Sequence, residues 1–249
     1  MLKYPLSTLL YLAKINIKDT IQDALRLKNN LDIRLTVTVK DKDGKIIKQH
    51  KQKSHSFLMN FAALLATTMY NPYNQSVNWY YFKSTAGTWY SLSNTSAGTT
   101  TYNNIFDLLD SNNDSSYGIV VGTGTATPTP NDYNLQSQIV NGTGSGQLVY
   151  GSHSISPTPA TSALQAGTTT PTSGVLTPSG NTTSFQVSRM FQNQSGASIT
   201  VSEVGIIAEV YAYNNVSIYV LIIHDLLSSA ITIPNGGVIA ITYTISVTT

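Results

Sequence analysis

The sequence of 249 residues contains no cysteine, which excludes disulfide bonds and thiolate metal sites and leaves the redox compartment undetermined. Charge is also scarce: 10% of the residues are charged, against about 25% in an ordinary soluble domain. Glutamate occurs twice, at Glu203 and Glu209. No apolar run approaches the ~18 residues of a transmembrane helix, so no membrane span is predicted.

The apolar content is the feature that argues for a folded chain. At 41% it is too high for a disordered protein. A surface with so few charges must present hydroxyls, amides and tyrosines, and a freely diffusing monomer of that kind tends to self-associate. The composition therefore favours an assembly subunit or a secreted protein over a solitary cytosolic globule.

The few charges are unevenly distributed. Residues 1–53 hold twelve Lys/Arg against five Asp/Glu, a net charge of +7, whereas residues 54–249 hold two against seven, a net of −5. A basic leader on a nearly neutral body indicates an anionic or polar partner at one end and protein or solvent at the other.

The first 70 residues show three patterns. Apolar residues spaced by three and four predict an amphipathic helix over 6–28. Alternation over 33–39, the Asp-Lys-Asp-Gly turn at 41–44 and the return over 45–51 predict a β-hairpin. A short apolar helix, capped by Ser54 or Ser56, is expected from Phe57 to Met69. Its inward residues are predicted to be Leu58, Phe61, Leu64 and Leu65.

The rest of the chain reads as β structure. Aromatic residues between 70 and 116 suit short strands, and residues 118–124 form a strand that ends in a turn. The Ser/Thr/Pro-rich stretch 156–183 predicts a long loop. Beyond it, period-two alternation separated by Gly/Asn/Pro turns is typical of an antiparallel sandwich or barrel, with the apolar run 218–223 as a central strand.

Two segments resemble a known group of proteins. One is Val187-Ser-Arg-Met-Phe-Gln-Asn-Gln-Ser-Gly-Ala-Ser-Ile-Thr-Val-Ser-Glu-Val-Gly-Ile206, and the other is the closing segment 231–245. They are similar to β-rich virion structural proteins of tailed phages and archaeal viruses. Gly118-Ile-Val-Val-Gly-Thr-Gly124 fits the same order of segments, whereas His224 stands where that group has an arginine.

The resemblance implies structural motif residues rather than catalytic ones. Asn193 and Gly196 are expected to form a turn. Glu203, just before Gly205, is expected either to bond a neighbouring backbone or to pair with Arg189.

Together these patterns predict a mainly β fold: an antiparallel, jelly-roll-like β-sandwich with an N-terminal amphipathic helix and one further short helix. The expected organisation is an N-terminal helical arm (1–30), a basic β-hairpin plus short helix (31–69) and a β-sandwich body (70–249) with the loop at 156–183.

No constellation for catalysis or cofactor binding stands out. The four histidines, His50, His55, His153 and His224, match no metal or catalytic spacing. The sequence Asp110-x-Asn112-x-Asp114 begins like a calcium loop but lacks its glycine and its bidentate glutamate. We therefore expect no cofactor, no metal and no enzymatic activity. A hydrolase would need Glu203, Asp225 or a histidine.

A lysine cluster is the candidate contact region. It can meet nucleic-acid phosphates or another partner, or it can protect an exposed sheet edge from aggregation, and both interpretations stay open. Its members are Lys40, Lys42, Lys45, Lys48, Lys51 and Lys53.

The expected function is that of a virion structural protein that self-assembles in a symmetric particle, as a tail-adaptor, vertex or tail component or as a capsid subunit. Its partners are then copies of itself, other virion proteins and, through the basic region, nucleic acid. The alternative is an extracellular adhesin or carbohydrate-binding module that uses Trp79, Tyr80, Trp89 and Tyr90.

Overall fold

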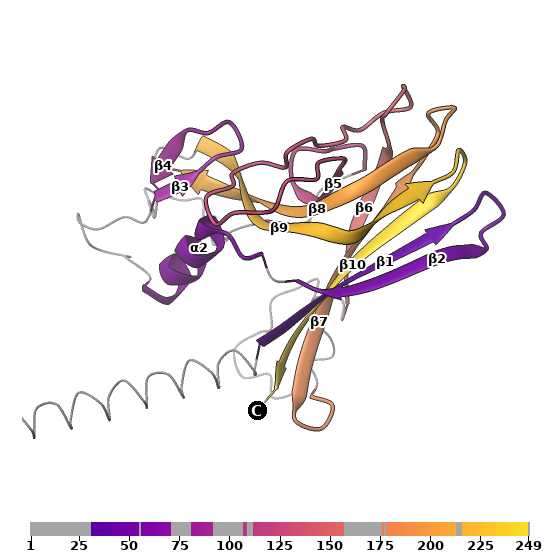
Figure 1. Cartoon of the computed structure of the whole chain (residues 1–249). Helices are drawn as coiled ribbons and strands as arrows, with labels where there is room; N and C mark the ends of the chain where they lie inside the picture. The colour runs from indigo at the N-terminus through magenta and orange to yellow at the C-terminus, as the bar shows by residue number, and fades with distance from the viewer. Residues whose placement is uncertain are drawn as a thin grey trace, which may run out of the picture.

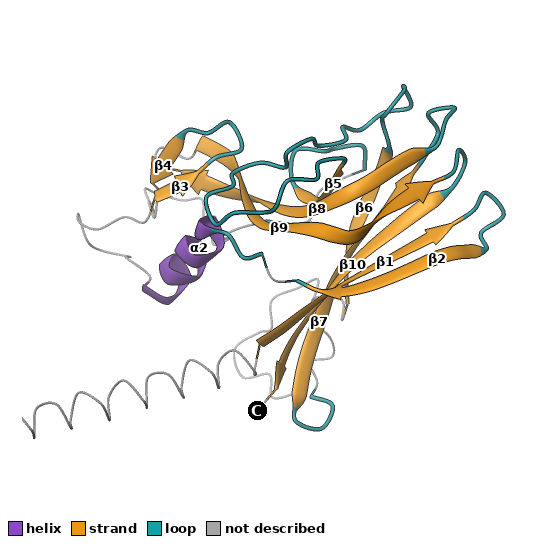
Figure 2. Cartoon of the chain, in the orientation of Figure 1, coloured by secondary structure: helices purple, strands orange, loops and turns teal. Residues whose placement is uncertain are grey.

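The computed structural model describes residues 31–54, 56–70, 81–91, 107–108, 112–156, 176, 178–212 and 216–248. This part of the chain is mainly β, with three antiparallel sheets and one helix, α2 (Met59–Tyr70) (Figures 1 and 2). The helix expected at 6–28 and most of the loop 156–183 lie outside the described residues.

The largest sheet has five strands in the order β2-β1-β10-β7-β6. These are β2 (Ile46–Lys53), β1 (Leu31–Lys40), β10 (Val238–Thr248), β7 (Thr182–Gln192) and β6 (Val149–Ser156). A three-stranded sheet contains β5 (Gly118–Gly122), β8 (Ile199–Ala212) and β9 (Val216–Ile233), and a two-stranded one pairs β3 (Tyr81–Lys83) with β4 (Trp89–Ser91).

The basic hairpin is built into the largest sheet. The strand β1 pairs with β2 on one side and with β10 along its whole length on the other, from Leu31↔Val247 to Lys40↔Val238. Its alternate residues are buried, because a strand turns successive side chains to opposite faces. The hairpin and the C-terminal strand are therefore one structural unit.

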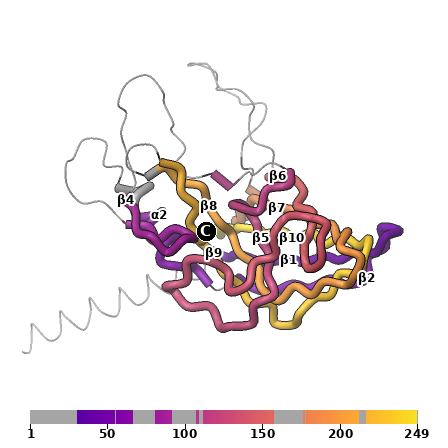
Figure 3. The backbone as a smooth tube through the Cα atoms, turned by 90° about the horizontal axis from the view of Figure 1, so that it is seen from above, coloured from indigo at the N-terminus to yellow at the C-terminus, as the bar shows by residue number. Residues whose placement is uncertain are grey.

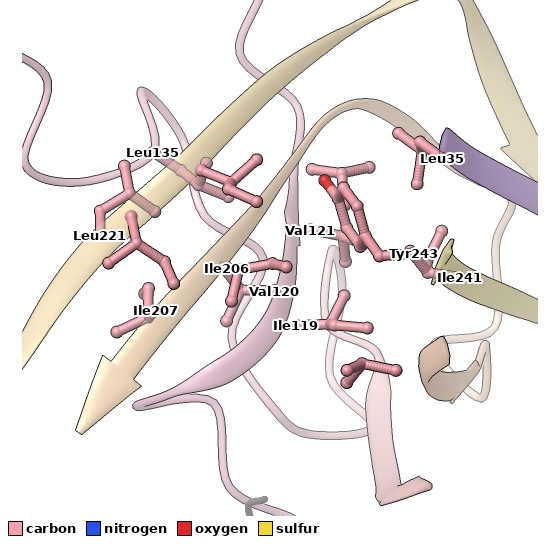
Figure 4. Packing of buried hydrophobic residues seen from close by; sticks show 14 of the residues in the cluster. Leu35, Ile119, Val120, Val121, Leu135, Ile206, Ile207, Leu221, Ile241 and Tyr243 are labelled. Carbon is pink, nitrogen blue, oxygen red and sulfur yellow. The ribbon is translucent and has the colours of Figure 1, made fainter. Parts of the chain in front are cut away.

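The inward faces of the two larger sheets share one buried cluster. Figure 4 shows Leu35 and Tyr243 of the five-stranded sheet near Val121 of the three-stranded sheet, and Figure 3 shows the two sheets overlapping when seen from above. The Tyr243 hydroxyl donates a hydrogen bond to Asp225 on β9 at 3.0 Å. Burial and the nearby Asp225 charge raise the pKa of Tyr243 well above its ordinary value, so this hydroxyl stays a donor.

Two expectations are wrong in detail. Leu65 is 51% exposed rather than packed inward, because α2 turns Asn60 and Leu64 toward the strands instead. The segment 218–223 belongs to β9 at the margin of its sheet, since β8 is the central strand. Its apolar residues are still buried, because segment 56–58 covers the free side of β9, with Leu58 N–H donating to Ile222 O at 3.1 Å.

Replacing Leu35 with Ala tests the shared core. Leu35 is fully buried, so Leu35→Ala is expected to lower the free energy of unfolding by about 3 kcal/mol. Leu31→Ala on the same strand is the matched control, because Leu31 is 41% exposed and the loss there is expected to stay below ~1 kcal/mol. Urea denaturation measures both, and equal losses would contradict the described packing of β1.

Candidate functional site

Glu203 is a buried carboxylate on β8 whose hydrogen bonds go to a neighbouring loop. Its oxygens accept the backbone N–H of Gly124 at 3.0 Å, of Gln136 at 3.0 Å and of Ser137 at 2.8 Å. The side chain is 1% exposed. One side chain therefore fixes both ends of the loop 123–137 to β8.

The Gly-Thr-Gly step after β5 is explained by this carboxylate. A Cβ at Gly122 or Gly124 would lie 2.3 or 2.5 Å from Glu203 Oε1. That is far closer than side-chain atoms approach one another. Glycine is required at both positions because the carboxylate occupies the space of a side chain.

His224 joins this network from β9. Its Nε2 lies 2.9 Å from Glu203 Oε2, and its Nδ1 lies 2.8 Å from Oδ2 of Asp132, which belongs to the same loop. An ionised carboxylate only accepts hydrogen bonds, so both ring nitrogens must donate, and this requires the imidazolium. The resulting carboxylate–imidazolium–carboxylate contact, Glu203–His224–Asp132, is referred to below as the clamp.

The electrostatics of the clamp agree with this protonation state. Burial alone would lower the pKa of His224, but the hydrogen bonds and charges of Glu203 and Asp132 outweigh it and raise the pKa. Burial opposes ionisation of Glu203, yet His224 and the three backbone N–H groups hold its pKa below the ordinary value. The pKa of Asp132 is likewise lowered, since bonds from Thr129 and His224 exceed the effect of burial.

Arg189 is the second buried charge and lies on β7. It is 1% exposed and donates to the carbonyls of Gly151 at 2.8 Å, Tyr117 and Ile119 at 3.1 Å each, and Asp114 at 2.5 Å. Its guanidinium also lies 4.6 Å from the ring centroid of Tyr150. Arg189 therefore ties the five-stranded sheet to β5 and to the segment that precedes it.

Asn193 and Gly196 lie in the turn between β7 and β8. The Asn193 amide donates to Ala197 O at 2.8 Å and to Ile233 O at 2.9 Å, and Gly196 adopts a positive φ of 85°. Gly196 N–H donates to the side chain of Asn235 in the β9–β10 turn at 3.1 Å. The two turns are thereby held together at one end of the sheet.

The hairpin lysines do not all face the same way. Lys48 points to the inner side and donates to Ala230 O at 3.1 Å. Lys51 and Lys53 lie opposite the outward-facing residues Thr36 and Arg34, and Lys53 is 3.3 Å from Asp32. The other members of the cluster, Lys40, Lys42 and Lys45, are exposed at and beside the turn.

The remaining histidines are dispersed. His50 Nε2 lies 2.9 Å from Gln52 on β2, and His153 on β6 accepts the backbone N–H of Ile119 at 2.7 Å. His55 lies outside the described residues. Within the described ranges no group of three or more His, Asp or Glu residues is arranged to hold a metal ion.

Two important residues escaped the sequence analysis. Asp132 lies in a polar turn 92 positions from His224, and no local pattern connects the two. Asn60 is buried in α2, where it bonds both the N–H and the C=O of Lys83 and also Leu221 O. The one available signal for Asn60 was a polar residue within an apolar helix.

Comparisons with known proteins give no match, whether with family models, with curated proteins or with solved structures. In the part of the chain that the structure describes, no helix is long and apolar enough to cross a membrane.

The fit of Glu203 against the Gly-Thr-Gly step can be tested by adding one methyl group. Gly124→Ala is expected to cost about 2 kcal/mol of unfolding free energy, because the Cβ displaces the carboxylate from its backbone donors. Thr123→Ala is the control, since Thr123 is exposed and its loss is expected to stay within ~0.5 kcal/mol. Urea denaturation distinguishes them; a neutral Gly124→Ala would refute the close approach.

The clamp predicts a stability maximum in weakly acidic solution. The raised pKa of His224 adds stability that is fully present below about pH 6.5 and is lost as the pH rises through the folded-state value. The lowered pKa values of Glu203 and Asp132 add stability that is lost as the pH falls into the acid range.

His224→Gln tests this dependence. At pH 6 the variant is expected to lose at least about 1.5 kcal/mol, the value of a hydrogen bond to a charged group. Between pH 6 and 9 its unfolding free energy is expected to change less than that of the natural chain. Urea denaturation over this range measures both curves, and parallel curves would mean that His224 does not titrate as described.

Proposed function

We propose that this chain is a non-enzymatic virion structural protein that self-assembles in a symmetric particle. The finer fold assignment that goes with it is a jelly-roll-like β-sandwich, formed by the five-stranded and three-stranded sheets. The resemblance of segments 187–206 and 231–245 to virion proteins motivates the proposal. In such a particle the chain serves as a tail-adaptor, vertex or tail component, or as a capsid subunit.

The observation that carries the proposal is that the motif residues are buried and hold neighbouring loops in place. Arg189 and Glu203 are buried, and their hydrogen bonds go to backbone groups of neighbouring loops. His224 is 2% exposed and held between two carboxylates. A catalytic group must reach its substrate, whereas these side chains are used to fix loops, as a subunit of fixed shape requires.

The surface proposed for self-association is the β3–β4 hairpin, which lies far from the tip of β1–β2 (Figure 1). Tyr81 is 60% and Trp89 is 52% exposed. Lys83 lies on the same face, directly opposite Trp89, with Nζ 5.9 Å from the Trp89 ring centroid and 4.0 Å from that of Tyr133. Large aromatic residues on a rigid base are the side chains that dominate protein interfaces.

The hairpin has the rigidity that such a surface needs. Phe82 is fully buried beneath it, and Asn60 bonds the backbone of Lys83 on both sides. Binding therefore does not have to order the hairpin, which lowers the entropic cost of association.

The assembly proposal is tested by sedimentation velocity of the full chain from dilute to concentrated solution. We expect a closed oligomer that Trp89→Ala weakens at least about tenfold, as loss of an interface aromatic does. Ile46→Ala is the control, because Ile46 is 55% exposed but lies on the basic hairpin. A chain that stays monomeric at all concentrations would overturn the proposal.

The adhesin alternative rests on the same exposed aromatics, since Trp and Tyr rings also stack on sugars. Trp79 and Tyr80 lie outside the described residues, and Tyr90 packs against the core. A glycan array separates the two functions. Glycan binding by a monomer, abolished in Trp89→Ala, would replace the assembly proposal by the adhesin.

A further inference from the structure

The exposed positive charge of the described chain is concentrated in one place. Residues 31–53 hold seven Lys/Arg and three Asp. In the remaining described ranges the Lys/Arg residues are Lys83 and Arg189, and Arg189 is buried, as is the His224 imidazolium. A concentrated positive field of this kind attracts an anionic partner.

Strand pairing divides these cations between the two sides of the hairpin. Ile33, Leu35, Val37 and Val39 of β1 are buried, so the even-numbered residues of this strand face outward. Residues directly opposite each other share a face, which places Lys53 beside Arg34 and Lys51 beside Thr36 on the outer side. The outer basic row is therefore formed by Arg34, Lys40, Lys51 and Lys53.

The inner side is used for internal packing. Lys48 donates to Ala230 O at 3.1 Å, and Gln52 donates to Leu226 O at 3.0 Å. These bonds attach β2 to the middle of β9. Lys48, a member of the expected contact cluster, is exposed on the side opposite the row, where it bonds Ala230 O. Arg34 lies in the row but was not part of the expected cluster.

We propose that the outer basic row binds the phosphate backbone of duplex DNA. With a rise of ~3.3 Å per residue, the six steps from Arg34 to Lys40 span about 20 Å along the strand. Duplex DNA carries one charge per ~1.7 Å of its axis, so about twelve phosphates lie within this length. Asp32, which pairs with Arg34 at 2.5 Å and with Lys53 at 3.3 Å, leaves the row with a net positive charge.

The neighbouring outer side chains suit phosphate rather than lipid. Thr36, Thr38 and Gln49 lie within the row, and Thr242 and Thr244 continue the face on β10. Hydroxyls and amides donate to phosphate oxygens. The exposed apolar side chains at this end of the hairpin are Ile46, opposite Lys40, and its neighbour Ile47. Two such residues are fewer than the apolar face with which an amphipathic segment enters a bilayer.

This inference does not depend on the proposed assembly, because a monomer presents the complete row.

The test is fluorescence anisotropy of a labelled duplex DNA with the full chain over a series of salt concentrations. The variant Lys40→Gln/Lys51→Gln removes two charges from the row and spares the Asp32 ion pairs. The matched control, Lys42→Gln/Lys45→Gln, removes two charges at the turn, and both variants keep the charges of residues 1–30.

We expect Lys40→Gln/Lys51→Gln to reduce the magnitude of the salt slope by about 2 and the affinity at low salt by at least about tenfold. The control is expected to lower the slope by less than half as much, and duplexes of different sequence are expected to bind equally. Unfolding midpoints verify that both variants fold.

Three outcomes would overturn the proposal. They are no binding to DNA by the natural chain at low salt, equal losses in the two variants, and tighter binding to vesicles containing phosphatidylserine than to DNA with the same dependence on Lys40 and Lys51. The second outcome would mean that net charge alone governs binding, and the third would identify an anionic membrane as the partner.

Discussion

The buried carboxylate of Glu203 is the constraint on which the surrounding structure depends. Removing a carboxylate from water costs several kcal/mol unless charges and hydrogen bonds replace the solvent. Three backbone N–H groups and the His224 imidazolium provide that replacement. Because the N–H groups come from the two ends of the loop 123–137 and the imidazolium comes from β9, satisfying one charge fixes this loop and β9 relative to β8. The glycines at 122 and 124 follow from the same requirement.

Arg189 is a buried cation whose charge is compensated by backbone carbonyls, as backbone N–H groups compensate the Glu203 carboxylate. It also lies against an aromatic ring, and it holds the segment before β5 against β6 and β7. In both places an ionic side chain bonds backbone groups of an irregular segment that lies against a sheet. Loops need such partners because an unpaired buried backbone group is costly. This accounts for charged residues within the core of a chain that has few charges elsewhere.

The sequence predicted the features that depend on neighbouring residues along the chain, and it missed those that depend on contacts between distant segments. Period-two alternation identified the β1–β2 hairpin and the strands of the last third, because one face of each strand is buried. The position of β9 at a sheet margin was missed, since burial on both faces also results when segment 56–58 covers a marginal strand. The clamp was missed because Asp132 meets His224 only after the chain has folded. For Glu203 the sequence offered backbone bonding or a pair with Arg189; it bonds three backbone N–H groups, and its histidine partner was not anticipated.

The pairing of β1 with β10 also bears on how the protein is made. Leu31 aligns with Val247, so the N-terminal hairpin meets its neighbouring strand about two hundred residues later in synthesis. Contacts of such long range form slowly. Until the ribosome releases β10, the apolar side of β1 is left uncovered beside β2. Charged side chains on an exposed edge strand oppose its pairing with other chains, and β2 carries Lys48, Lys51 and Lys53.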